Sequence, residues 1–141
     1  MATLKKILAP TDLSDVSATG LRYAIQLARD IGAELIIFNV MILDETNTVD
    51  EQGVERQRTR LDRFVSDKVV ISEDVKIRKI VDAGDAYGAI LDCADSEHVD
   101  LIIMSSHGRS GLSRMLIGSV TDKVIRGASC PVLVVPVKNK N

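Results

Sequence analysis

Residues 100–120 read DLIIMSSHGRSGLSRMLIGSV, and residues 131–135 read PVLVV. The first stretch joins an apolar run, a loop rich in glycine, serine and arginine, and the start of a helix. The second stretch is another apolar run. Short apolar runs bounded by turn residues are typical of strands that are buried on both faces. The order strand, loop, helix, strand therefore predicts one unit of a parallel α/β sheet.

The rest of the chain alternates between strand and helix patterns in the same way. In the helical segments, apolar residues recur at spacings of three and four. Besides 100–106 and 131–135, the expected strands are 5–10, 34–40 and 75–83. The first expected helix begins after its cap, Ser14 or Asp12, and ends at Gly32. The other expected helices are 51–68, 85–97 and 118–127.

Five strands and about four helices, joined by right-handed crossovers, make a doubly wound sheet that is covered on both faces. The predicted fold is an α/β domain with a five-stranded parallel sheet. No change of composition marks a second domain within residues 1–141. The longest irregular segment, residues 44–53, is polar and longer than the usual connection, so we expect a surface excursion or a lid there.

Composition limits the classes of partner. The chain has 18 Lys and Arg residues against 20 Asp and Glu residues, and its formal net charge is −2. These charges are interspersed, so no basic tract predicts binding to nucleic acid or to a membrane surface. The apolar run before Pro10 is too short for a signal peptide or a membrane span. We therefore expect a soluble cytoplasmic protein.

Ligands of doubly wound sheets bind outside the carboxyl ends of the strands, where the strand order reverses. This rule places residues 9–12, 39–41 and 105–119 on one rim of the domain. Gly108 allows a ligand to approach the backbone closely, because it has no Cβ. Gly118 and Ser119 open a helix whose unpaired N–H groups favour an anion. Together these residues predict a phosphate cradle.

An ordinary turn is the alternative interpretation of the same residues. Ser119 would then be only a helix N-cap, and Gly108 would serve a turn. The Walker pattern G-x-x-x-x-G-K-[ST] is absent, and no G-x-G-x-x-G follows the first strand. The loop is therefore not a Walker P-loop, and ordinary dinucleotide binding is disfavoured.

SSHGRSGLSRMLIGSV, followed by CPVLVV, resembles the C-terminal signature of the universal stress protein family. Nucleotide-binding members of that family show Gly, two residues, Gly, nine residues and then Gly-Ser or Gly-Thr. Here Gly108 is the second glycine and the pair is Gly118-Ser119, whereas Ser105 stands at the first glycine position. KKILAPTDLSD, ELIIFNV and VDAGDAYGAIL resemble the first three strands of the family and their loops, so the resemblance covers almost the whole chain.

The resemblance implies a Rossmann-like fold that binds ATP, or the related ADP or AMP, in a stress-response regulatory protein with at most slow ATP hydrolysis. It assigns phosphate binding to Gly108, Gly118 and Ser119. Beside a triphosphate, Asp12 would need a divalent cation such as Mg²⁺ between the like charges. No residue is expected to be catalytic, because no nucleophile or orienting carboxylate accompanies His107.

The resemblance also assigns the nucleoside contacts. Asp12, with Pro10 and Thr11, would meet the ribose or the adenine, and Val40 would contact the base through its backbone. The remaining expected contacts are Met104, Ser105, His107, Arg109 and Val120.

The last apolar run predicts a partner. It is followed only by the polar tail PVKNKN, so we expect it at an edge of the sheet, where unpaired backbone groups invite pairing with a second copy. The family resemblance also implies a homodimer, formed through the terminal strand Val132 to Val135.

Two other functions remain open. Ser105 at the first glycine position supports a nucleotide-free, dimeric protein-interaction module with the same fold. Asp12 after the first strand suggests a phosphoacceptor receiver domain. That chemistry needs an aspartate directly after the third strand and a lysine after the fifth, whereas Asp82 and Asp85 lie in a glycine turn and the fifth strand ends in valine and proline.

Overall fold

The computed structural model of the chain describes residues 3–43, 49–108 and 117–137. Its elements alternate as predicted, and no helix within these ranges is long and apolar enough to cross a bilayer. The strands are β1 (Lys6–Pro10), β2 (Glu34–Met41), β3 (Ile77–Ala83), β4 (Leu101–Ser105) and β5 (Val132–Val135). The helices are α1 (Asp15–Ile31), α2 (Glu51–Lys68), α3 (Ala86–Ser96) and α4 (Ser119–Gly127).

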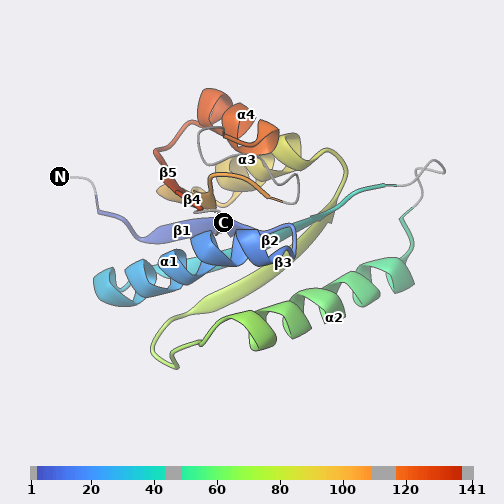
Figure 1. Ribbon diagram of the computed structural model, residues 1–141, viewed down its shortest axis with the longest axis horizontal. Coiled ribbons are helices and arrows are strands. Elements are labelled where there is room, and N and C mark those ends of the chain that lie inside the picture. Colours follow the sequence, from blue (N-terminus) through green and yellow to red (C-terminus); the bar gives the residue numbers. More distant parts are fainter. Residues whose placement is uncertain (1–2, 44–48, 109–116, 138–141) are drawn as a thin grey trace.

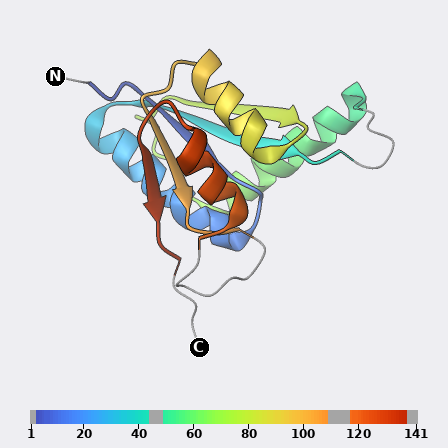
Figure 2. The same cartoon turned by 90° about the horizontal axis from the view of Figure 1, so that it is seen from above.

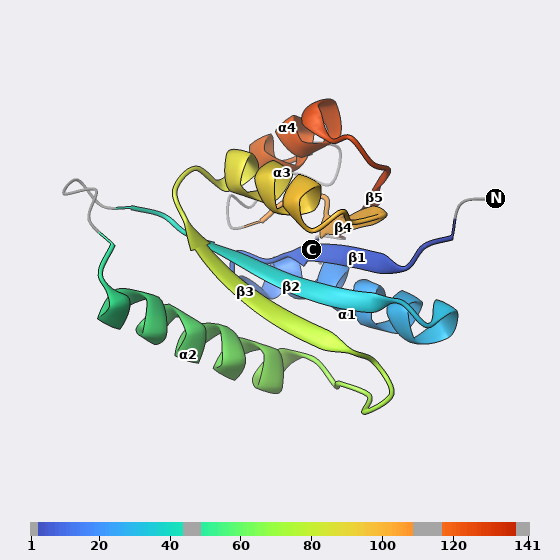
Figure 3. The ribbon, with the colours of Figure 1, turned by 180° about the vertical axis from the view of Figure 1, so that it is seen from behind.

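The strands form one parallel sheet in the order β3-β2-β1-β4-β5, which confirms the predicted fold class. Helices α1 and α2 cover one face, and α3 and α4 cover the other (Figure 1; seen from behind in Figure 3). The order reverses between β1 and β4, which is where such sheets bind ligands. Receiver domains have the order 2-1-3-4-5, so the receiver hypothesis does not fit this topology.

The sheet is buried on both faces because successive side chains of a strand point in opposite directions. In β4, Ile103 packs into the apolar core shared with α1 and α2. Its neighbours Ile102 and Met104 pack into the core shared with α3 and α4. A strand that serves two cores must be apolar at almost every position, which is why the run 101–104 contains no polar residue.

Helix boundaries follow local capping. Ser14 is the N-cap of α1, where its hydroxyl accepts a hydrogen bond from Ser17 N at 3.1 Å. Gly32 ends the helix in the left-handed conformation, with φ 72°. Asp50 caps α2, so residues 51–53, which the expected helix 51–68 and the irregular segment 44–53 both included, are helical. Residues 44–48 lie outside the described residues, so the expectation of a lid at this segment stays a prediction.

An ion-pair network joins the amino ends of three strands. Arg78 of β3 donates to Glu34 of β2 at 2.7 Å and to Glu97 at 2.5 Å. Lys6 of β1 donates to the Glu97 carbonyl at 2.9 Å. The hydrogen bond from Arg78 lowers the pKa of Glu97, and Glu97 and Glu34 in turn raise the pKa of Arg78. Because this network lies at the end of the sheet opposite the predicted rim, we interpret it as structural.

Strand β5 lies at the edge of the sheet, as predicted, and its outer side is open in the view from above (Figure 2). Among the described strands, its backbone pairs with β4 alone. The carbonyls of Pro131 and Val135 accept from Ile102 N and Ser106 N of the β4 side, at 3.0 and 2.9 Å. Since backbone direction alternates along a strand, the N–H and C=O groups of Val132 and Val134 face away from β4.

Helix α1 and the end of β4 lie unusually close together. Ser105 Oγ accepts a hydrogen bond from Gly20 N at 2.9 Å and donates one to Val16 O at 3.0 Å. The hydroxyl thereby links two backbone groups one turn apart. A Cβ added at Gly20 would lie 2.6 Å from Ser105 N, so only glycine fits this contact.

We predict that Gly20→Ala destabilises the protein by about 1–3 kcal/mol, although alanine is the better helix former by about 1 kcal/mol. The control is Gly127→Ala in α4, where the added Cβ meets only the side-chain end of Leu91, which can rotate away. We expect the control to be neutral or slightly stabilising. Urea unfolding of both variants measures the difference, and equal free energies of unfolding would contradict the proposed contact.

Candidate functional site

A cavity of about 520 Å³ opens at the carboxyl ends of the strands, on the predicted rim. This volume lies within the range of roughly 300–1,000 Å³ that is typical of small-molecule sites. Arg109 lies outside the described residues. All the other residues that we expected to contact a ligand line the cavity: Pro10, Thr11, Asp12, Val40, Met104, Ser105, His107, Gly108, Gly118, Ser119 and Val120.

The cavity is also lined by residues that we did not name as ligand contacts from the sequence. Asn39 and Met41 were expected on the rim, and Asn39 could have been noticed as a polar residue within an apolar strand. Gln57 and Arg60 come from α2, whose approach to the rim depends on tertiary packing. The further lining residues are Ser17, Phe38, Ile42, Ala86, Ile90 and Thr121.

The loop after β1 is held in one conformation by its own side chains. Thr11 Oγ1 accepts from Leu13 N at 3.1 Å and is hydrogen-bonded to Ser17 Oγ at 2.7 Å. Leu13 itself has φ 65°, a left-handed conformation that is rare for leucine. Asp12 Oδ1 accepts from the backbone N and the hydroxyl of Ser14. These bonds fix the position of the Asp12 carboxylate at the cavity.

Gly108 brings a second loop against Asp12. A Cβ added at Gly108 would overlap Asp12 Oδ2, so any other residue there would displace the Asp12 carboxylate. The carboxylate and the Gly108 backbone therefore form adjacent parts of one cavity wall.

Helix α4 begins at this wall without a capping side chain. Gly118 is its N-cap, in an extended conformation, and it makes no side-chain cap hydrogen bond. Its own N–H donates to Ser106 O at 2.8 Å. A Cβ at Gly118 would lie 3.1 Å from His107 Cα, so the glycine also permits close packing. Ser119 is the first helical residue rather than the N-cap, and the alternative interpretation of Ser119 was therefore wrong.

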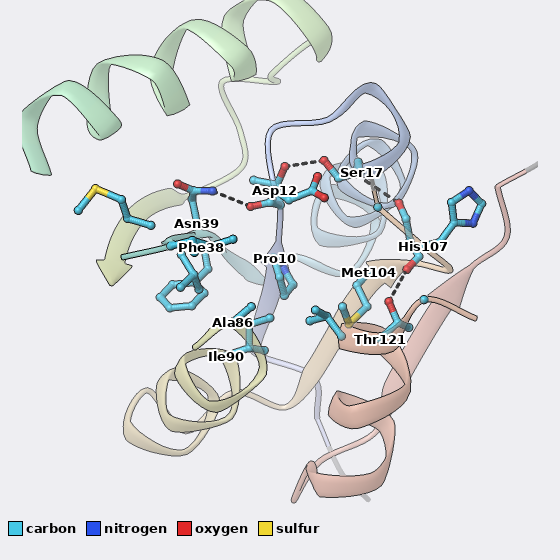
Figure 4. Close-up of a pocket in the computed structure, with 18 of the residues that line it drawn as sticks. Pro10, Asp12, Ser17, Phe38, Asn39, Ala86, Ile90, Met104, His107 and Thr121 are labelled. Atoms are coloured by element: carbon cyan, nitrogen blue, oxygen red, sulfur yellow. Dashed lines mark hydrogen bonds between the residues drawn. The ribbon is translucent and has the colours of Figure 1, made fainter. Parts of the chain in front are cut away.

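Two expected contacts present backbone rather than side chain to the cavity. The hydroxyl of Ser105 is engaged by α1, and the Ser105 carbonyl accepts from Thr121 Oγ1 at 3.0 Å. The His107 ring points away from the cavity in Figure 4. It is 2 % exposed, and its Nε2 has no hydrogen-bond partner in the part of the chain that the structure describes.

A chain of hydrogen bonds crosses from the Asp12 loop to α2 (Figure 4 shows its first link). Asn39 Nδ2 donates to Thr11 O at 2.8 Å, and Gln57 Nε2 donates to Asn39 Oδ1 at 2.7 Å. Asn39 is 2 % exposed, so its amide depends on these two partners. We call Thr11, Asn39 and Gln57 the amide relay.

The opposite wall of the cavity is apolar. Pro10, Phe38, Ala86, Ile90 and Met104 lie together below the Asp12 loop in Figure 4. The cavity thus has an apolar wall, a polar wall and the amino end of a helix. This combination suits a ligand that is part flat and apolar, part hydroxylated and part anionic.

Charged groups are few in the described lining, where Asp12 is the only carboxylate and Arg60 the only guanidinium. Within the same described ranges, no three histidine, cysteine or acidic side chains are grouped so that they could hold a metal ion. A divalent cation at this site would therefore need ligand oxygens in addition to Asp12.

Comparison with known proteins assigns the family. The family model described as the universal stress protein family matches residues 3–136. The chain belongs to the universal stress protein family. Among its curated relatives, the universal stress protein MJ0531 of Methanocaldococcus jannaschii is 33% identical over 142 residues, covering 93% of this chain and 81% of its own.

Solved structures of other universal stress proteins share the fold. The MJ0577 protein of the same organism is 31% identical, covers 99% of this chain and 100% of its own, and has a TM-score of 0.74. A universal stress protein solved in complex with cAMP is 25% identical and covers 96% of this chain and 98% of its own, with a TM-score of 0.68.

We predict that Thr121→Val destabilises the protein by about 1–3 kcal/mol, because the buried Ser105 carbonyl loses its side-chain donor at the start of α4. The matched control is Thr59→Val in α2, where the hydroxyl donates to Glu55 O on the exposed surface. The control should change stability by less than about 0.5 kcal/mol. Chemical unfolding monitored by circular dichroism compares the two, and equal losses would contradict this role of the Thr121 hydroxyl.

Proposed function

We propose that this universal stress protein binds an adenine nucleotide, ATP, ADP or AMP, in the rim cavity and acts through it as a stress-response regulator. The observation that carries the proposal is the start of α4 at Gly118. It has no side-chain cap, and it lies at one end of a cavity whose other walls are apolar and polar. The relative solved with cAMP, which itself contains an adenine nucleotide, supports the same chemical class.

Each part of the cavity matches one part of such a ligand. The first N–H groups of α4 and the Ser119 hydroxyl can donate to phosphate oxygens, and the helix dipole favours the negative charge there. Gly108 allows the phosphates to approach the backbone. The Asp12 carboxylate can accept hydrogen bonds from ribose hydroxyls. The apolar wall, with Val40 and Val120, can bury a purine.

The described residues fit binding better than turnover. Rapid hydrolysis needs a positioned base that takes a proton from water. The His107 ring points away from the cavity, and Asp12 is hydrogen-bonded to its own loop. We therefore propose slow hydrolysis at most. Mg²⁺, where present, would lie between Asp12 and the phosphates and reduce their mutual repulsion.

We predict that the purified protein releases adenine nucleotide on denaturation, or binds added ATP, ADP or AMP when it is purified empty. Native mass spectrometry followed by denaturing mass spectrometry identifies any ligand that is carried through purification. Isothermal titration with each nucleotide, with and without Mg²⁺, measures the affinity. A protein that carries no nucleotide and gives no heat with any of them would overturn the proposal.

We also propose that the protein is a homodimer through β5. The outward N–H and C=O groups of Val132 and Val134 lie at an open edge, and their side chains are only half-buried. Pairing with the same strand of a second copy would satisfy these groups, because an edge strand is a ready template for another strand.

Val134→Pro tests this edge. Proline removes the N–H group that faces away from β4 and leaves the bonds to β4 in place, and edge strands tolerate proline. We expect the variant to be a monomer with nearly unchanged secondary structure, whereas the control Val134→Thr should remain a dimer. Light scattering at micromolar concentration gives the mass. A wild-type monomer, or a dimeric Val134→Pro variant, would disprove pairing through β5.

The nucleotide-free interaction module finds less support. Its basis in the sequence was Ser105 in place of the first motif glycine. The Ser105 hydroxyl is turned toward α1, where it bonds to Gly20 and Val16, so the substitution does not fill the cavity.

A further inference from the structure

The amide relay has only one possible direction. Thr11 O is a carbonyl oxygen and can only accept, so the Asn39 atom at 2.8 Å must be the donor Nδ2. The other Asn39 amide atom, Oδ1, is then an acceptor. The Gln57 atom at 2.7 Å from it must therefore be the donor Nε2. The orientation of two side-chain amides follows from one backbone carbonyl.

The remaining polar atom of Gln57 is consequently an acceptor. Gln57 lines the cavity and is half-buried, and its Oε1 accepts no hydrogen bond within residues 3–43, 49–108 and 117–137. Rotating the amide to present Nε2 instead would place two oxygens against each other at Asn39. The cavity wall at α2 therefore offers an oxygen that accepts and does not donate.

The position of Gln57 decides which part of a nucleotide it would meet. In Figure 4, α2 and the first link of the amide relay lie at one end of the cavity, and Thr121 with α4 lies at the other, with Asp12 and Pro10 between them. A nucleotide with its phosphates at α4 and its ribose at Asp12 has its base directed toward Asn39, Val40 and α2. Gln57 is then the polar side chain at the base.

We propose that Gln57 is a specificity-determining residue that selects a 6-aminopurine over a 6-oxopurine. This inference rests on the proposed nucleotide binding. The amino group of adenine can donate to Gln57 Oε1, whereas the 6-oxo oxygen of hypoxanthine would face it with a second acceptor. The selection depends on Asn39 and Thr11 as well, because they hold the Gln57 amide in one orientation.

Arg60 lines the same end of the cavity, one helical turn from Gln57, and its guanidinium only donates. Acting alone, it would favour the 6-oxo group. Its side chain is exposed, however, and water competes for its donors. Gln57 is half-buried and held by the amide relay, so we expect its preference to prevail.

The experiment compares the binding of AMP and IMP, which differ at the 6-position of the purine, where an oxo group replaces the amino group, and at N1, which carries a proton only in IMP. Isothermal titration is performed on the wild-type protein, on Gln57→Met and on Gln52→Met. Gln52 lies in the first turn of α2, is exposed and does not line the cavity, so it provides the same chemical change away from the site. The circular dichroism spectrum and the unfolding temperature report whether each variant is folded. Gln57→Ala replaces Gln57→Met if the latter is not.

We expect the wild-type protein and Gln52→Met to bind AMP roughly tenfold more tightly than IMP, as suits one hydrogen bond lost and one acceptor left unpaired. Gln57→Met should bind both ligands within about twofold of each other. A folded Gln57 variant that keeps the wild-type preference would overturn the assignment, because the preference would then arise elsewhere.

Equal wild-type affinities for AMP and IMP would also overturn it, and tighter binding of IMP would assign the selection to Arg60. If the wild-type protein binds ATP but neither monophosphate, ATP and ITP replace AMP and IMP, and equal affinities for the two triphosphates would overturn the specificity inference and leave the proposed function in place. Failure to bind any of the nucleotides would overturn the proposed function itself. The two failures are therefore distinguishable.

Discussion

The rim of this domain depends on the contact between Gly20 of α1 and the end of β4. Backbone approaches backbone there, and the Ser105 hydroxyl bonds to two backbone groups of the helix. Ser105 O in turn accepts from Thr121 in the first turn of α4. One residue thus sets the distance of α1 from the sheet and the place where α4 begins. The cavity lies at these two helices and α2 because the strand order reverses between β1 and β4.

The same contact gives a structural role to Ser105, the departure from the family motif. Serine at the first glycine position adds a polar group that needs partners when buried. Here it finds them in α1, where Gly20 leaves room, and not in the cavity. The motif alone could not distinguish a donor for phosphate from a structural link, because both roles suit a small hydroxyl side chain.

The polar groups of the site include the hydrogen-bonded amides of the amide relay as well as charged side chains. The described lining holds one carboxylate and one guanidinium, so few strong electrostatic contacts are available. In the proposed binding mode, the N–H groups of the first turn of α4, beginning at Ser119, and oriented side-chain amides would carry most of the recognition instead, because the Gly118 N–H donates to Ser106 O. Such neutral groups can discriminate between ligands by geometry, because each donor or acceptor that is left unpaired in a buried site costs free energy.

The order of elements, the parallel sheet, the edge position of β5 and most residues of the rim could be predicted from the sequence. Local rules determine these features: apolar runs, helical periodicity, caps such as Ser14 and Gly32, and the binding of ligands at strand ends. The direction of the Ser105 and His107 side chains could not be predicted, nor could the position of Gln57 and Arg60 in the cavity lining. These depend on how α1 and α2 pack on the sheet, and that packing joins residues far apart in the chain through contacts that no local pattern records.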